Sequence, residues 1–176
     1  MSKKHRRIVR ELAETTLMTV VVFIFLVTFV VQGFKVYGSC MEPNLFTGER
    51  LLGNKFVYRF EKPSRGDIIV FRFPPDPHKI FIKRIVALPG ETVEIRQGKV
   101  YINGKPMHEP YMRKVAHGDF PPQKVPKGNV FVLGDNRDAS NDSRFWGDLP
   151  IKNIQAKAWL RYWPMARMTV FNSPWR

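Results

Sequence analysis

Short apolar runs separated by glycine and proline turns fill the chain from residue 46 onward. The runs are rich in β-branched and aromatic residues, which favours strands over helices. We expect strands at 51–52, 56–58, 68–73, 80–88, 92–96, 99–102, 129–133 and 154–163. Short strands at this spacing, with little helix between them, predict a mainly β fold, built as an antiparallel barrel or as folded sheets.

One segment of this domain, at 90–128, is expected to leave the main sheet as a β-hairpin excursion. Asn103-Gly104 is a strong signal for a tight hairpin turn between two of the runs. Prolines crowd residues 105–128, which show little periodicity, so we predict a loop or flap there. Residues 74–77, which contain three prolines, should likewise end the strand at 68–73.

An uncharged apolar run extends over residues 15–31. With its apolar flanks it covers 12–34, which is long enough to cross a hydrocarbon core of ~30 Å as a helix. Five basic residues precede it, and positive charge stays on the cytoplasmic side of a membrane. We therefore predict a plasma-membrane protein with a cytoplasmic tail at 1–11, a transmembrane anchor at 12–34 and an extracytoplasmic domain at 35–176. A cleaved signal peptide and a buried core helix are the alternatives, although the first usually has a shorter apolar centre.

Charge and cysteine content narrow the choice of partners. The formal net charge is +14 at pH 7, and the chain has one cysteine. A basic outer domain suits the anionic head groups of a phospholipid bilayer, or it provides a well-solvated surface. Nucleic acid is a poor partner for a domain that the topology places outside the cell. One cysteine allows no internal disulfide, so core packing must stabilise the domain.

Lys83 lies within an apolar strand and is the first candidate for chemistry. Phe81 and Ile85, two residues away on either side, share one face of that strand with it. A lysine on a buried face incurs a desolvation cost that lowers its pKa, and a neutral amine is a general base. Arg84 follows directly, and a regular strand turns only one of the two basic side chains inward. The pattern does not decide which one.

Cys40 is the second candidate, on an irregular loop marked by Gly38 and Pro43. It follows the apolar run by nine residues. Even a fully extended chain of that length keeps the cysteine within ~30 Å of the membrane edge. A nucleophile there reaches only substrates at the membrane surface. The alternative is a buried and unreactive cysteine that fills space.

Acidic and basic side chains are concentrated within residues 134–144. A metal site is disfavoured because no histidine accompanies the carboxylates and arginines crowd them. We predict a salt-bridged turn that holds hydroxyl groups such as that of Ser140 beside a buried base. An ordinary charged surface turn is the alternative.

Four segments, in chain order, resemble the sequence boxes of the type I signal peptidases. They are MEPNL at 41–45, RGDIIVF at 65–71, KRIVALPG at 83–90 and GDNRDASNDSR at 134–144. The first box differs from the family at Asn44, where threonine is usual. The resemblance implies a membrane-bound endopeptidase with an all-β catalytic domain, which removes signal peptides from secreted preproteins without a metal or another cofactor.

The resemblance also implies roles for individual residues. Lys83 would be the general base, Ser140 would hydrogen-bond to its amine, and the main-chain N–H of Cys40 would be an oxyanion donor. A second donor, a hydroxyl in some members, would fall at Gly38 and is lacking here. The remaining implied residues are Arg84, Asp135, Asp142 and Arg144 as structural ion pairs, and Met41 and Pro43 beside the substrate.

Cys40 occupies the position of the family's serine nucleophile, because a methionine follows it directly. Three explanations stay open: a replacement that traps an inactive enzyme, a natural thiol variant, and a natural pseudoenzyme. We expect an inactive or impaired peptidase. The rival classes are a non-catalytic membrane-anchored peptide-binding protein and a sortase-like cysteine transpeptidase. The latter would need histidine and arginine partners and a cysteine late in the chain.

Overall fold

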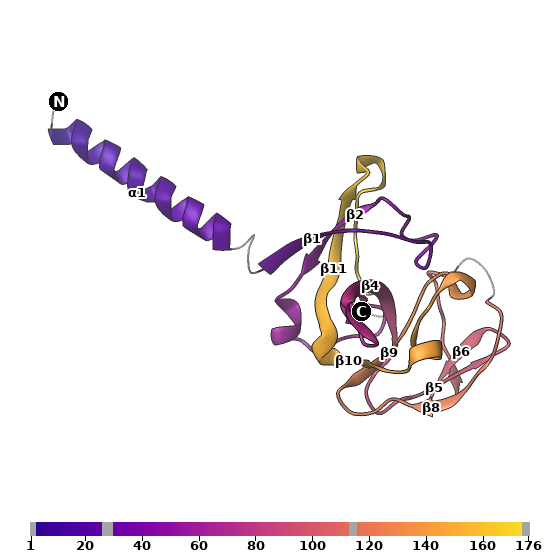
Figure 1. Cartoon of the computed structure of the whole chain (residues 1–176). Coiled ribbons are helices and arrows are strands. Elements are labelled where there is room, and N and C mark those ends of the chain that lie inside the picture. Colours follow the sequence, from indigo (N-terminus) through magenta and orange to yellow (C-terminus); the bar gives the residue numbers. More distant parts are fainter. Residues whose placement is uncertain (1–2, 26–29, 113–115, 174–176) are drawn as a thin grey trace.

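The computed structural model describes residues 3–25, 30–112 and 116–173. Within these ranges the chain forms two antiparallel β-sheets and two α-helices, α1 (Lys3–Phe25) and α2 (Ser143–Trp146) (Figure 1). Apart from α1, helical structure in these ranges is limited to the single turn of α2 and short segments. The predicted mainly β fold is therefore confirmed.

The larger sheet has the strand order β1-β2-β11-β3-β4-β9-β10, with β12 paired to β11. The predicted runs at 68–73, 129–133 and 154–163 form β3, β9 and β11 with the expected bounds. β4 begins earlier than expected, at Asp76, and only residues 74–75 separate it from β3. Pro77 lies where the pairing of the two strands shifts register, an irregularity that tolerates proline. The strands are β1 (Val31–Lys35), β2 (Arg50–Asn54), β3 (Ile68–Phe73), β4 (Asp76–Ala87), β9 (Asn129–Leu133), β10 (Leu149–Pro150), β11 (Ile154–Trp163) and β12 (Thr169–Val170).

A smaller sheet, in the order β7-β6-β5-β8, lies within the segment that we expected to leave the main sheet. Its strands are β5 (Thr92–Arg96), β6 (Lys99–Ile102), β7 (Lys105–Pro106) and β8 (Phe120–Lys124). Residues 113–115 of the predicted flap lie outside the described residues. Both sheets contribute to one hydrophobic cluster, in which Val86 and Phe131 of the larger sheet pack with Val93 and Val100 of the smaller one.

Residues 56–58 do not form the predicted strand. They lie instead at a 3-10 turn at Val57–Arg59. Asn54 at the end of β2 explains the difference, because its Oδ1 accepts hydrogen bonds from the main-chain N–H groups of Phe56 (2.8 Å) and Val57 (3.0 Å). A side chain that caps the backbone in this way ends a strand and favours a helical turn.

β3 is buried on both faces and positions the loop that carries Cys40. Successive residues of β3 enter different hydrophobic clusters, as strand alternation requires. On one face Ile68 packs with Met41 and Leu45, which are both fully buried. These two side chains lie one and five residues after Cys40, so they fix the loop on the sheet.

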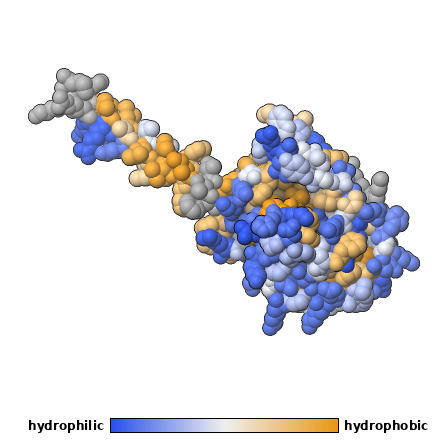
Figure 2. All heavy atoms as spheres, viewed as in Figure 1, coloured by the Kyte–Doolittle hydropathy of each residue, from blue (hydrophilic) through white to orange (hydrophobic). Residues whose placement is uncertain are grey.

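The N-terminal region differs from the predicted anchor. The side chains of α1 that the structure describes, at 7–25, are all exposed, and Figure 2 shows apolar atoms gathered along this helix. Among the helices of the described ranges, none has the length and apolarity that crossing a membrane requires. Residues 26–29 of the predicted 12–34 span lie outside the described residues. The end of that span instead forms β1, which pairs with β2 in a register that sets Phe34 opposite Leu51.

Candidate active site

Lys83 and Cys40 meet although they are 43 residues apart in sequence. Lys83 Nζ lies 3.1 Å from Cys40 Sγ. The same amine donates to the main-chain oxygen of Ile82 (3.1 Å), which Cys40 Sγ also approaches (3.8 Å). Lys83 is only 3% exposed. The structure therefore decides what strand alternation left open, since Lys83 faces the cysteine and Arg84 points to an ion pair elsewhere.

Cys40 lies in a turn that depends on Gly38. Gly38 has a φ of 83°, in the left-handed region that favours glycine. The main-chain N–H of Glu42 donates to Ser39 O (3.1 Å) and closes the turn around Cys40. The Cys40 N–H itself makes no hydrogen bond within the described residues, so it remains available as a donor.

Asn136, two residues after Gly134 in the chain, also holds the Cys40 turn. Asn136 donates from its main-chain N–H to Cys40 O (2.9 Å) and from Nδ2 to Ser39 O (3.1 Å). Gly134 allows this approach, because a Cβ there would lie 2.5 Å from Cys40 O and 2.2 Å from Ser140 Oγ. No pattern in the sequence indicated the role of Asn136, although it belongs to the fourth box.

Two ion pairs lie beside the site. Arg84 contacts Asp135 through two hydrogen bonds, Nε to Oδ1 (2.8 Å) and Nη2 to Oδ2 (2.7 Å), and both side chains are buried. Arg144 Nε donates to Asp142 Oδ1 (2.8 Å), and Asp142 Oδ2 accepts from the Gly134 N–H (3.1 Å). In the ranges that the structure describes, no group of three or more His, Cys, Asp or Glu side chains could hold a metal ion.

Three predicted site residues do not have the expected contacts. Ser140 makes no hydrogen bond to Lys83, and its buried Oγ has no hydrogen-bond partner in the described part of the chain. The lysine amine turns instead toward Cys40 Sγ and the carbonyl of its own strand. Met41 and Pro43 do not line the groove beside the cysteine, because Met41 fills the core beneath the loop and is 0% exposed.

A buried cluster around Arg137 was not expected from the sequence. Arg137 forms an ion pair with Glu109, which also accepts a hydrogen bond from Tyr111 Oη (2.6 Å). Burial and the charge of Glu109 raise the pKa of Tyr111, so its phenol stays neutral. Burial opposes the charge of Arg137, but the charge of Glu109 outweighs it and raises the pKa of the guanidinium. No spacing rule connects residue 109 with residue 137, so only the folded chain reveals this cluster.

The lysine and the cysteine lie at the wall of a groove of about 740 Å³. Its lining includes residues 34–40, which run from the end of β1 into the Cys40 turn, and residues 80–83 of β4. Residues 80–83 pair with β3, whereas β9 joins β4 only from Arg84 onward. One edge of β4 thus remains free of a strand partner within the described residues, next to the lysine.

Comparison with known proteins gives a consistent result. The family described as "Signal peptidase, peptidase S26" matches residues 9–163. The chain is 40% identical over 164 residues to "Probable signal peptidase I-2" of Synechocystis sp., a match that covers 90% of this chain and 75% of that protein. It is 42% identical over 135 residues to "Signal peptidase I V" of Bacillus subtilis, covering 69% and 79% of the two chains. A crystal structure of a signal peptidase I from Enterococcus faecalis is 36% identical, with a TM-score of 0.50, and covers 55% of this chain and 97% of that one.

The four sequence boxes, the antiparallel fold and these matches point to one family. The chain belongs to the type I signal peptidases of family S26, which are serine-type endopeptidases.

Proposed function

We propose that this protein binds the signal peptides of exported preproteins in the groove and cleaves them with Cys40 as nucleophile and Lys83 as general base. The observation that carries the proposal is the 3.1 Å contact between Lys83 Nζ and Cys40 Sγ at the groove wall. The substrate class comes from the relatives, which are named signal peptidases.

The free edge of β4 favours an extended substrate. Residues 80–83 carry main-chain groups that a peptide strand can pair with, and residues 34–40 also line the groove. A peptide added in this way has its main chain held by hydrogen bonds while alternate side chains enter pockets. Such binding would carry the scissile carbonyl past Cys40.

The proposed reaction uses groups that are already in contact. The Lys83 amine takes the proton of the Cys40 thiol, and the sulfur attacks the scissile carbonyl carbon. The Cys40 N–H donates to the oxyanion. The Lys83 ammonium then protonates the departing amine of the mature protein, which leaves the signal peptide as a thioester on Cys40. Water that gives a proton to the same lysine hydrolyses the thioester and restores the thiol.

Cysteine in place of serine should impair this reaction. A thiol is a stronger acid than a hydroxyl, so its proton transfer to an amine is less closely coupled to the attack on the carbonyl. Sulfur is also larger than oxygen and forms longer bonds. A displacement of ~1 Å at the reacting atoms costs about 10²-fold in rate. We therefore expect slow cleavage or none from the chain with Cys40.

The test is a Cys40→Ser exchange with a purified preprotein as substrate. Cleavage should rise at least about 10-fold, and Lys83→Ala in the same background should abolish it. Ser64→Ala is the control, because Ser64 does not line the groove and its hydrogen bonds with Asp67 use only main-chain atoms of residue 64. A Cys40→Ser protein no faster than the parent would contradict our account of Cys40. Unchanged cleavage after Lys83→Ala would exclude the lysine as the base.

We also propose that the protein acts at the plasma membrane, with the catalytic domain on the extracytoplasmic side. The uncharged run at 15–31 and the exposed apolar side chains of α1 support an attachment to the bilayer through this region. The basic tail before it supports the orientation. A peptidase held there would meet signal peptides while they are still at the lipid surface.

A further inference from the structure

We infer that Asn44 is a positioning residue, which aligns the turn carrying Cys40 with the strand carrying Lys83. The inference rests on the proposed function, since it concerns the alignment of the two proposed reacting groups. Asn44 lies in the turn segment that begins at Cys40.

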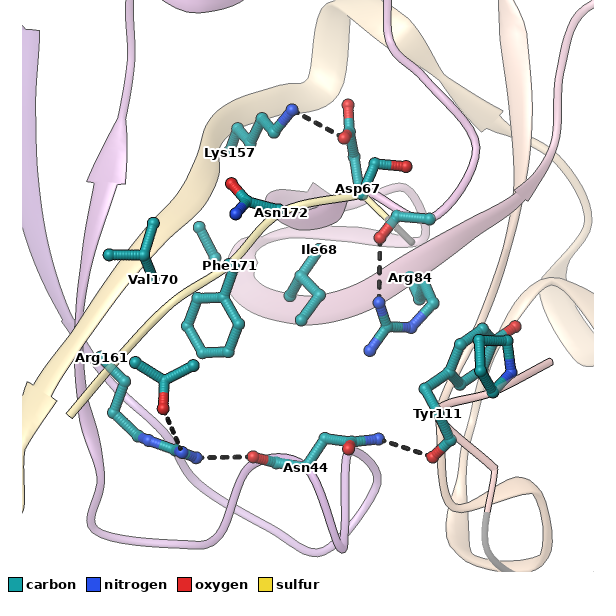
Figure 3. A pocket seen from close by; sticks show the side chains of 15 residues that line it. Asn44, Asp67, Ile68, Arg84, Tyr111, Lys157, Arg161, Val170, Phe171 and Asn172 are labelled. Carbon is teal, nitrogen blue, oxygen red and sulfur yellow. Dashed lines mark hydrogen bonds and ion pairs between the residues drawn. The ribbon is translucent and has the colours of Figure 1, made fainter. Parts of the chain in front are cut away.

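The side chain of Asn44 uses both of its N–H donors. Asn44 Nδ2 donates to Asp135 Oδ2 (2.8 Å) and to the main-chain oxygen of Tyr111 (3.0 Å). A primary amide has two N–H groups, so neither is left over. The main-chain oxygen of Asn44 in turn accepts from Arg161 Nη1 (2.7 Å), and Figure 3 shows these contacts with Arg161 and Tyr111 on either side of Asn44.

Asp135 connects Asn44 to the strand that carries the lysine. The carboxylate that accepts from Asn44 also holds Arg84 through two hydrogen bonds, and Arg84 is adjacent to Lys83 on β4. The next residue, Asn136, holds Cys40 O and Ser39 O. Residues 135–136 therefore contact the Cys40 turn at both of its ends. Asn136 binds Ser39 O and Cys40 O at the start of the turn, and Asp135 accepts from Asn44 at its end.

Hydrogen bonds, not close packing, set the position of the Asn44 side chain. Asn44 lines a second cavity, of about 360 Å³, on whose walls Arg84 and Tyr111 also lie (Figure 3). Two contacts fix Tyr111 itself. The centroid of its ring lies 4.1 Å from Arg84 Cζ, and its hydroxyl donates to Glu109. An apolar side chain of similar size would fit beside the cavity but would remove the Asn44 hydrogen bonds to Asp135 Oδ2 and Tyr111 O, and with them the link between the two segments.

The experiment compares Asn44→Leu and Asn44→Thr with Asn172→Leu. Asn172 lines the same cavity but makes no side-chain hydrogen bond within the described residues, so it is a matched control. The first readout is the rate of alkylation of Cys40, the one cysteine of the chain, by iodoacetamide near neutral pH. This reaction requires no signal peptide, and the thiolate that an adjacent amine favours is the reactive form.

The second readout is preprotein cleavage by the same variants in the Cys40→Ser background. For Asn44→Leu we expect alkylation about 10-fold slower and kcat about 10²-fold lower, with KM nearly unchanged, because alignment and not binding is lost. Asn44→Thr keeps one donor, so its alkylation rate and its kcat should lie between those of Asn44→Leu and those of the parent. Asn172→Leu should match the parent in both readouts.

The outcomes separate this inference from the proposed function. A folded Asn44→Leu protein with the parent's alkylation rate and kcat would overturn the positioning role. If Asn44→Leu does not fold, Asn44→Thr decides, and the parent's alkylation rate in that variant would overturn the role. Slower alkylation in Asn44→Leu, together with a Cys40→Ser protein that cleaves no preprotein, would support the positioning role and overturn the proposed function.

Discussion

Position 134 favours glycine because Ser140 and Cys40 crowd the place that a Cβ would occupy. A Cβ on residue 134 would lie 2.2 Å from Ser140 Oγ and 2.5 Å from Cys40 O, far inside van der Waals contact. Rotation of the Ser140 hydroxyl would not relieve this clash, because Ser140 Cβ would also lie 2.5 Å away. Cys40 O belongs to the main chain of the turn that carries the proposed nucleophile. The absence of one methyl group therefore allows the turn to approach the fourth box.

We expect Gly134→Ala to displace the Cys40 turn. In the Cys40→Ser background the cleavage rate should fall about 10²-fold, and overpacking should reduce the free energy of unfolding by about 1–3 kcal/mol. Gly33→Ala is the control, because the nearest atom to its added Cβ, Tyr162 Oη, is 4.0 Å away. Cleavage assays and thermal unfolding of both variants check the prediction, which parent-like cleavage by Gly134→Ala would contradict.

The smaller sheet depends on a close contact between its hairpin and the chain that precedes β8. Gly98, in the turn between β5 and β6, has a φ of 73° and lies so close to residue 116 that a Cβ would overlap Ala116 O. The same turn is held by hydrogen bonds from Gly98 N to Gly118 O (3.2 Å) and from Gln97 N to Asp119 Oδ1 (2.6 Å). Because this sheet shares a core cluster with β4 and β9, loosening the turn should affect the whole domain.

Gly98→Ala should therefore destabilise the protein more than Gly104→Ala. Both glycines have a positive φ, so both variants carry backbone strain of about 1 kcal/mol, but nothing lies within 4 Å of the Cβ position at Gly104. The extra steric clash should lower the Tm of Gly98→Ala further, within a single unfolding transition. Calorimetry distinguishes the two variants, and equal Tm values or two separate transitions would refute the expectation.

For the molecule as a whole, charge and an exposed apolar helix both favour a lipid surface. The chain carries a net charge of +14. Large apolar side chains of α1 are exposed, among them Leu17 (65%) and Val21 (53%). Electrostatic attraction is screened by salt, whereas burial of apolar side chains in the bilayer is not.

The full chain should accordingly stay bound to vesicles of phosphatidylcholine and phosphatidylglycerol at about 1 M salt, where the Debye length is ~3 Å. The double variant Leu17→Lys with Val21→Lys should bind at low salt but dissociate at high salt, because it adds charge and removes apolar area. Vesicle flotation at low and high salt measures the binding of the parent chain and of the double variant. Release of the parent chain by salt alone would show that its attachment is electrostatic, against our proposal for α1.

Local sequence information was sufficient for most of the strands and for the membership of the family. Strand periodicity and turn residues act over a few positions, which is why β3, β5, β6, β9 and β11 have the predicted bounds. The exception at 56–58 also has a local cause, a capping side chain at Asn54 that outweighs strand propensity. The four boxes could be recognised without coordinates because each is contiguous in the chain.

Only the tertiary structure decided which of these residues touch. The pairing of β4 with β3 and β9 turns Lys83 toward Cys40 and Arg84 toward Asp135. In the folded chain Ser140 lacks the expected hydrogen bond to Lys83, and Asn44 contacts three distant segments. These contacts join residues that are tens of positions apart, and their geometry depends on strand register and core packing. The physical reason is that periodicity in a sequence reports which face a side chain occupies, but not which distant side chain meets it there.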